Sequence, residues 1–131
     1  MDDSERLNSL RLFIGALTRV LGSQKEVPFD PVSFAKVVAD AQGEGNEFAR
    51  RFAVYTTIAG KLCPDFQEGL TLAQSAGLIS RQNPSYTQFS LRMPLRQVRR
   101  LEEDGIFEAA EQLAERYTER LGLKSTTHAT A

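Results

Sequence analysis

The sequence predicts a mainly α-helical fold with one β-hairpin and with long helices at its two ends. Two patterns lead to this prediction. Apolar residues recur at spacings of three and four through most of the chain, as they do on one face of a helix. In residues 87–93 that spacing gives way to alternation, which is typical of a strand with one buried face. A length of 131 residues with 41% hydrophobic and 25% charged side chains suits one globular domain, which we expect to span residues 1–122.

The first helix is expected from Ser4 to Leu21 and is apolar on two neighbouring sides. One stripe consists of Leu7, Leu10, Ile14, Leu17 and Leu21, and the other of Leu12, Phe13, Ala16 and Val20. A helix with two apolar sides needs two partners to cover them. This helix is therefore either central in the fold or shared with a second molecule, and the second case predicts a homodimer formed through the terminal helices.

Three further helices are expected before the hairpin. The second covers residues 30–43, with Asp30 as its N-cap and a proline in its first turn, where a missing N–H costs nothing. The third is assigned to residues 46–62 behind Asn46, although its β-branched residues weaken the helix propensity. A short fourth helix covers residues 66–76 and ends at a glycine.

A hairpin and a long helix complete the predicted domain. The hairpin has a first strand at residues 78–82, a turn at residues 83–85 and a second strand that ends at residue 93. Its alternation sends one set of side chains to the core: Thr87, Phe89, Leu91 and Met93. The final helix runs from Pro94 to Leu121, and Gly105 either kinks it or splits it in two. We expect residues 123–131, which are small and polar, to be disordered.

The chain carries no catalytic, metal or cofactor motif that we recognise. Its only histidine, His128, lies in the C-terminal tail, which argues against a histidine-based triad or metal site. Its only cysteine, Cys63, has no CxxC partner and is expected to be a small buried apolar residue. Neither the P-loop pattern nor GxGxxG occurs. We therefore predict a protein that is not an enzyme and that uses no cofactor and no metal.

Charge and hydropathy predict a cytoplasmic protein without a membrane partner. No stretch approaches the ~18 consecutive apolar residues of a membrane span, and the acidic N-terminus is unlike the basic start of a signal peptide. A single cysteine fits a reducing compartment. The formal net charge of −1 gives no global attraction to nucleic acid or to anionic lipid, so any such attraction must be local.

One stretch of the chain is strongly basic. The sequence GLISRQNPSYTQFSLRMPLRQVRR contains no acidic residue and five arginines: Arg81, Arg92, Arg96, Arg99 and Arg100. On a helix, the last three fall within one and a half turns, so they form a patch suited to nucleic acid or to another anionic surface. The alternative is an ordinary solvated face, neutralised by ion pairs such as Arg99 with Glu102 or Glu103.

The order of the elements between Pro31 and Met93 resembles the winged-helix family. The stretch LTLAQSAGLISRQNPSYTQFSLRM is similar to the end of such a domain, with a helix, a strand, a wing and a return strand. The resemblance implies that the helix at residues 66–76 lies in the major groove of DNA. Its side chains able to read base edges are Gln67, Thr71, Gln74 and Ser75. This helix departs from a DNA-binding pattern because it contains no lysine or arginine, and many winged-helix domains bind proteins instead.

Two functions therefore stay open. The first is a small cytoplasmic, non-catalytic regulatory or adaptor protein that acts through protein–protein association, as a homodimer or with another protein. The second is a winged-helix DNA-binding transcriptional regulator that uses the basic strip from Arg81 to Arg100. The first needs no cationic recognition helix, whereas the second needs the arginines to neutralise phosphates.

Overall fold

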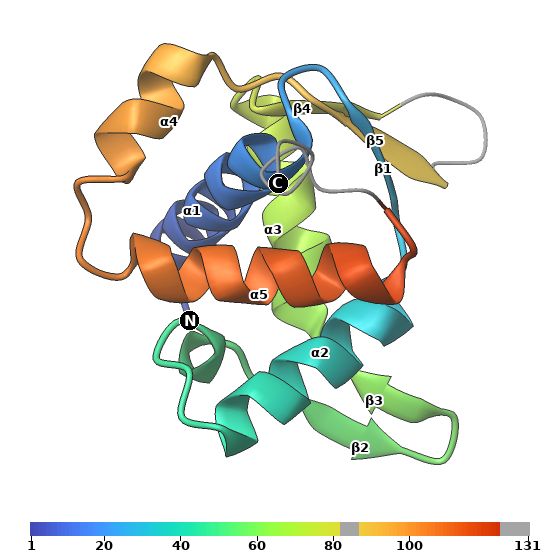
Figure 1. Ribbon diagram of the computed structural model, residues 1–131. Coiled ribbons are helices and arrows are strands. Elements are labelled where there is room, and N and C mark those ends of the chain that lie inside the picture. The colour runs from blue at the N-terminus through green and yellow to red at the C-terminus, as the bar shows by residue number, and fades with distance from the viewer. Residues whose placement is uncertain (82–86, 124–131) are drawn as a thin grey trace.

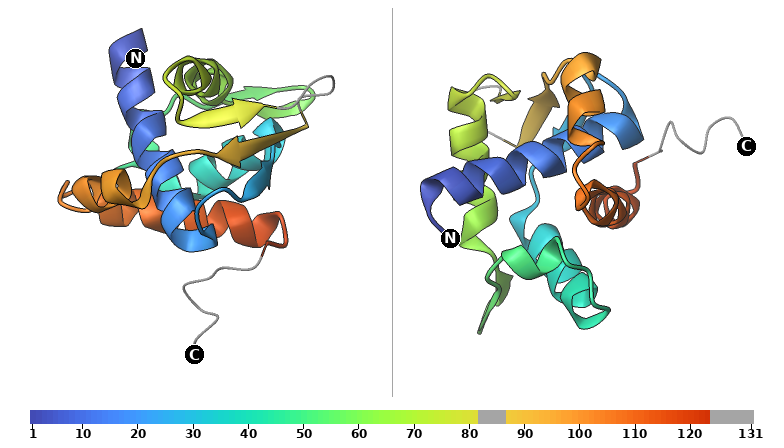
Figure 2. Two further views of the ribbon diagram at one scale, coloured as in Figure 1. Left: turned by 90° about the horizontal axis from the view of Figure 1, so that it is seen from above. Right: turned by 90° about the vertical axis from the view of Figure 1, so that its left-hand side faces the viewer.

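The computed structural model describes residues 1–81 and 87–123, and these residues form five α-helices, one 3₁₀ turn and five short strands. The helices are α1 (Asp3–Leu21), α2 (Pro31–Gly43), α3 (Pro64–Ser75), α4 (Leu95–Leu101) and α5 (Phe107–Arg120), and the 3₁₀ turn is η1 (Ala49–Arg51). Helix α1 passes through the middle of the molecule and packs against α3, α4 and α5 (Figures 1 and 2). The mainly helical character predicted from the sequence is thus confirmed, with small antiparallel sheets added to it.

The strands form two separate antiparallel sheets. The strands are β1 (Glu26–Pro28), β2 (Tyr55–Thr57), β3 (Gly60–Leu62), β4 (Ile79–Arg81) and β5 (Gln88–Leu91). The larger sheet has the order β1-β5-β4, with Phe89 of β5 opposite Val27 on one side and Arg81 on the other. Strands β2 and β3 pair only with each other among the described residues.

Four aromatic rings at the centre of the core hold four helices together. Phe13, Phe34, Phe66 and Tyr117 come from α1, α2, α3 and α5, and each ring contacts the other three. The rings of Phe34 and Phe66 are stacked with centroids 3.9 Å apart, and the remaining pairs meet edge to face, the geometry that aromatic quadrupoles favour. The hydroxyl of Tyr117 donates to the Pro28 carbonyl at 2.9 Å, so α5 is also tied to β1.

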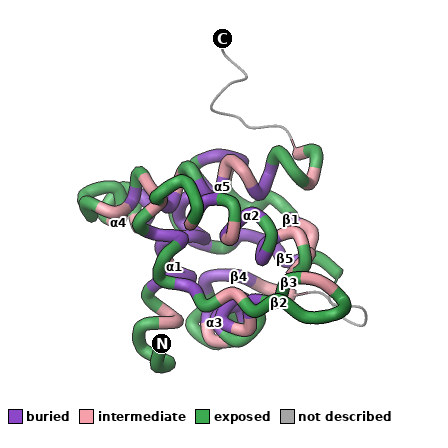
Figure 3. The backbone as a smooth tube through the Cα atoms, turned by 90° about the horizontal axis from the view of Figure 1, so that it is seen from below, coloured by how far each residue is buried: buried purple, intermediate pink, exposed green. Residues whose placement is uncertain are grey.

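Helix α1 buries both of its apolar stripes within one chain. Leu10, Ile14 and Leu17 are fully buried, as are Phe13 and Val20 of the second stripe (Figure 3). The side chain of Asp2 caps the helix by accepting a hydrogen bond from the Glu5 N–H, at 2.8 Å. The predicted helix is therefore confirmed, and its two sides find their partners inside the molecule. A homodimer through the terminal helices is therefore not needed to cover the apolar sides of α1.

The helix predicted for residues 46–62 is wrong. The side chain of Asn46 does accept a hydrogen bond from the Ala49 N–H, but only the 3₁₀ turn η1 follows. The chain then forms the β2–β3 hairpin, with Gly60 at a φ of 122° that L-residues rarely adopt. Four β-branched residues lie between η1 and Gly60 and favour strands over helices: Val54, Thr56, Thr57 and Ile58. Local propensity prevailed here over an apolar spacing that resembled a helix.

The C-terminal part of the prediction needs one correction, which concerns the exposure of Thr87 and Ser90. The final helix is split into α4 and α5 at Gly105, one of the two alternatives. Phe89, Leu91 and Met93 are buried as expected, but Thr87, which precedes β5, is exposed. Ser90 is buried within β5, the central strand between β4 and the unexpected β1. The predicted turn at residues 83–85 and all but the first residue of the predicted tail lie outside the described residues.

We predict that Gly69→Ala destabilises the protein by about 1–3 kcal/mol, the usual cost of overpacking a core. A Cβ at this position of α3 would lie 2.4 Å from Cδ2 of Leu10, which is fully buried and has no space to retreat. Gly43→Ala in α2 is the matched control, because a Cβ there meets nothing within 4 Å. Urea unfolding of the two variants measures the difference. An equal free energy of unfolding for both would show that the α1–α3 contact is looser than described.

Candidate functional site

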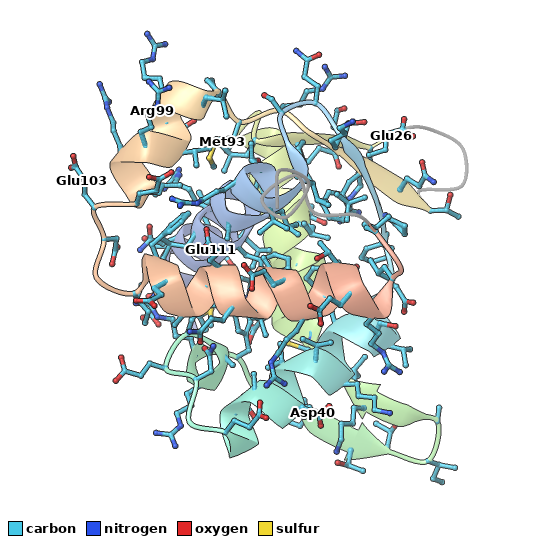
Figure 4. All side chains as sticks on the ribbon, viewed as in Figure 1. Glu26, Asp40, Met93, Arg99, Glu103 and Glu111 are labelled. Atoms are coloured by element: carbon cyan, nitrogen blue, oxygen red, sulfur yellow. The ribbon has the colours of Figure 1, made fainter. Side chains whose placement is uncertain are left out.

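Four of the five arginines of the basic strip are exposed around α4. Arg96, Arg99 and Arg100 lie on this helix, and Arg92 precedes it directly after β5. Val98 points inward and is buried, and Leu101 lies beside Gly15 of α1, which turns the opposite side of α4 toward solvent. Figure 4 shows Arg99 directed away from the body of the molecule. We call Arg92, Arg96, Arg99 and Arg100 the basic face of α4.

Arg81 does not belong to this face. It lies on β4, where its side chain is half-buried and its guanidinium carbon sits 5.2 Å from the centroid of the Phe29 ring. This is the geometry of a cation–π interaction, which stabilises a partly buried arginine. The five arginines that are close in sequence are therefore divided between two environments.

The carboxylates expected to neutralise the basic face are engaged elsewhere or lie apart. Glu102 Oε2 is 3.1 Å from Nη1 of Arg19 on α1, and Arg19 Nε is 2.7 Å from Oε2 of Glu111 on α5. Within residues 1–81 and 87–123, no carboxylate lies within ion-pair distance of any arginine of the basic face. The predicted pairing of Arg99 with Glu102 or Glu103 is thus not formed.

Arg19 compensates the negative charge of Glu111, which is partly buried and has other carboxylates nearby. Burial raises the pKa of the Glu111 carboxyl, the positive charge of Arg19 lowers it, and the nearby carboxylates of Glu115, Glu102 and Glu108 raise it further. The arginine therefore offsets the cost of a partly buried carboxylate surrounded by like charges. Arg19 has this structural role on α1, and the arginines of α4 have no equivalent one.

The polar residues predicted to read bases lie on a different surface from the basic face. Gln67, Thr71, Gln74 and Ser75 are exposed on α3 as expected. Helix α1 packs against both α3 and α4, and in the left-hand view of Figure 2 it lies between them. Helix α3 itself carries no lysine or arginine, and its exposed Glu68 lies 3.3 Å from Arg6. The two predicted sets of contact residues do not make one continuous surface.

An ion pair fixes the start of α3. Asp65 is buried and its Oδ1 accepts a hydrogen bond from Nε of Arg6 at 3.0 Å, while its Oδ2 accepts from the Ala53 N–H at 3.3 Å. The hydrogen bond to Asp65 raises the pKa of the Arg6 guanidinium, against the opposing effect of its desolvation. Both of these side chains serve to connect α1, α3 and the segment before β2, so we assign them a structural role.

Sequence reasoning missed a second exposed feature. The β2–β3 hairpin leaves Tyr55, Ile58 and Leu62 exposed, whereas the helix predicted for residues 46–62 would have aligned them along one stripe. The available signal was their β-branched neighbourhood, which indicates a strand. Among the described residues, no group of three or more histidine, cysteine, aspartate or glutamate side chains is arranged to hold a metal ion. Nor is any helix in this part of the chain both long and apolar enough to cross a membrane.

The chain matches no protein-family model, and comparison with curated proteins and with solved structures finds no match for it. Its own surface chemistry is therefore the basis on which a function can be proposed.

We predict that Cys63 is unreactive in the folded protein. The residue is 1% exposed, and burial, as the largest effect, raises the pKa of its thiol from 9.0 to about 11. Only a thiolate attacks a disulfide reagent, so Ellman's reagent at pH 8 should label the native protein far more slowly than the protein in guanidinium. Because the folded-state pKa is raised, the unfolded state ionises first, and stability should fall as the pH rises above about 9. Labelling at similar rates in both states would contradict the burial of this residue.

Proposed function

We propose that the protein is a small non-catalytic regulatory or adaptor protein that binds an acidic surface of a partner protein through the basic face of α4. The observation that carries this proposal is the exposure of four arginines without a carboxylate neighbour in the described part of the chain. Like charges gathered in this way repel one another, and the carboxylates of a partner relieve that repulsion. The flat guanidinium groups also suit bidentate binding of carboxylates.

We further infer a winged-helix-like core within this protein. The order α3, β4 and β5 agrees with the helix, strand and return strand of the resemblance, and β1 adds a third strand beside β5. Two additions distinguish this chain from that pattern. The β2–β3 hairpin is inserted between α2 and α3, and α4 and α5 follow the last strand.

DNA binding is the alternative function, favoured by one observation. Helix α3 precedes the β4–β5 hairpin and exposes the side chains Gln67, Thr71, Gln74 and Ser75, which can hydrogen-bond base edges. Most non-specific affinity for DNA comes from neutralised phosphates, and α3 supplies no cation for them. The separation of α3 from the basic face of α4 therefore makes an acidic protein surface the better-supported partner.

The proposal predicts that Arg96→Glu with Arg100→Glu weakens binding of an acidic partner by at least about tenfold, because two attractive charges become repulsive. The probe is a fluorescein-labelled polyglutamate peptide followed by anisotropy at two salt concentrations, with a 20-base-pair duplex as the second probe. The matched control is Lys36→Glu with Arg50→Glu, which makes the same change in net charge at two exposed positions on α2 and η1. The melting temperature of both variants should stay near that of the wild type, since none of the four side chains is buried.

Two results would overturn this proposal. Equal loss of polyglutamate binding in both variants would mean that net charge alone is responsible. The other result is tight binding of the duplex that depends steeply on salt and is abolished by Gln67→Ala with Gln74→Ala. It would establish α3 as the contact element and DNA binding as the function.

A further inference from the structure

The β2–β3 hairpin leaves an apolar cluster in solvent. It projects at the lower edge of the molecule in Figure 1 and is exposed along most of its length in Figure 3. Tyr55 is 56% exposed, Ile58 at the tip 109% and Leu62 40%. Exposed Val32 lies at the start of α2, the helix against which β3 packs. A grouped set of exposed apolar side chains marks a binding surface, and a hairpin of two short strands gains stability when something covers it.

The outer edge of β2 is open to another strand. Strand β3 lies between α2 and β2, so β2 forms the outside of the hairpin (Figure 1). In an antiparallel pair, alternate residues turn their N–H and C=O groups away from the partner strand. In the part of the chain that the structure describes, no third strand joins β2 and β3. Such an edge binds an extended peptide by main-chain hydrogen bonds.

The two faces of the hairpin differ in chemistry. The register places Tyr55 opposite Leu62 and Thr56 opposite Lys61, so one face is apolar and the other carries a cation. Lys61 Nζ lies 3.4 Å from Oγ1 of Thr56, so the ammonium group sits over β2, the strand with the open edge. No carboxylate of residues 1–81 or 87–123 is within ion-pair distance of Lys61.

We propose that β2 binds an extended segment of a partner protein as a third strand, and that this segment has the pattern apolar, acidic, apolar. A residue opposite Thr56 shares the face of Thr56 and Lys61, so a carboxylate there meets the Lys61 ammonium group. Of the two residues on either side of it, one lies opposite Tyr55 and the other opposite Thr57, on the face that carries the Tyr55–Leu62 pair. Apolar side chains at these two positions shield that pair from solvent. A second copy of β2 fits less well, because its sequence Tyr55-Thr56-Thr57 brings no carboxylate to Lys61.

This site is independent of the basic face of α4. The hairpin and α4 lie at opposite corners of the molecule in Figure 1. The protein can therefore hold two partners at once, one by its arginines and one by its β2 edge, which is the arrangement that an adaptor requires.

The test uses two synthetic peptides, Gly-Thr-Val-Glu-Val-Thr-Gly and the same sequence with lysine in place of glutamate, both blocked at their ends. Titration of ¹⁵N-labelled protein should show the glutamate peptide shifting the amide signals of residues 54–62. The wild type should bind the glutamate peptide about fivefold more tightly than the lysine peptide, and Lys61→Glu should bind the lysine peptide more tightly by about the same factor. A glutamate peptide N-methylated at the Glu amide should lose binding to the wild type, since the strand bond is blocked. Arg96→Glu with Arg100→Glu should not change the affinity for the glutamate peptide, and Lys61→Glu should not change the affinity for polyglutamate. Each proposal can therefore fail without the other.

Three outcomes would overturn the inference. One is the absence of shifts in residues 54–62 with either peptide at millimolar concentration. Another is equal affinity of the wild type for the two charged peptides, which would show that Lys61 selects nothing. The third is a concentration-dependent dimer in sedimentation that Thr56→Pro abolishes, because the occupant of the β2 edge would then be a second copy of this chain. Because Lys61 is exposed, its substitution should not disturb folding. The N-methylated peptide tests the same edge without any change to the protein.

Discussion

The mutual contact of four aromatic rings is the constraint on which the rest of the molecule depends. Phe13, Phe34, Phe66 and Tyr117 are spread over most of the chain and belong to four helices, yet every ring contacts the other three. Bringing them together fixes the crossing of α1 with α3 and α5, and it explains why α1 is buried on both of its apolar sides. The bond from the Tyr117 hydroxyl to β1 then sets the larger sheet against the same core.

This core determines which surfaces are left for partners. Because the long helices direct their apolar faces inward, few large apolar side chains of residues 1–81 and 87–123 are exposed outside the β2–β3 hairpin, Leu95 being one of them. The charges are divided in a similar way. Arg19 binds the glutamates that bridge α1, α4 and α5, and the arginines of the short helix α4 are left facing solvent. In the described part of the chain, the basic face of α4 and the apolar β2–β3 hairpin are the two surfaces on which the proposed associations depend.

The sequence predicted those parts of the fold in which one spacing of apolar residues, helical or alternating, is repeated several times. Helices α1, α2 and α3 and the burial of Phe89, Leu91 and Met93 belong to this group. The segment 46–62 misled the prediction because its apolar spacing fits a helix, while a positive-φ glycine and β-branched residues decide for a hairpin. Strand β1 has three residues, too few to show a period. The cluster of arginines is visible in the sequence. The contacts of Arg81 with Phe29 and of Glu102 with Arg19 are not, because they join residues far apart in the chain.

Native-state hydrogen exchange of Phe34→Leu tests the central role of the four rings most directly. The substitution leaves an apolar side chain of similar volume but removes the stacked contact with Phe66 and the edge contacts with Phe13 and Tyr117. If the cluster makes the helices one cooperative unit, the protection of the slowest amides in α1, α2, α3 and α5 should fall by a common factor. Val32→Ala, on the exposed side of the same helix, should leave protection in the other three helices unchanged. Loss of protection confined to α2 in Phe34→Leu would contradict the account, because the four helices would then be stabilised independently of their shared rings.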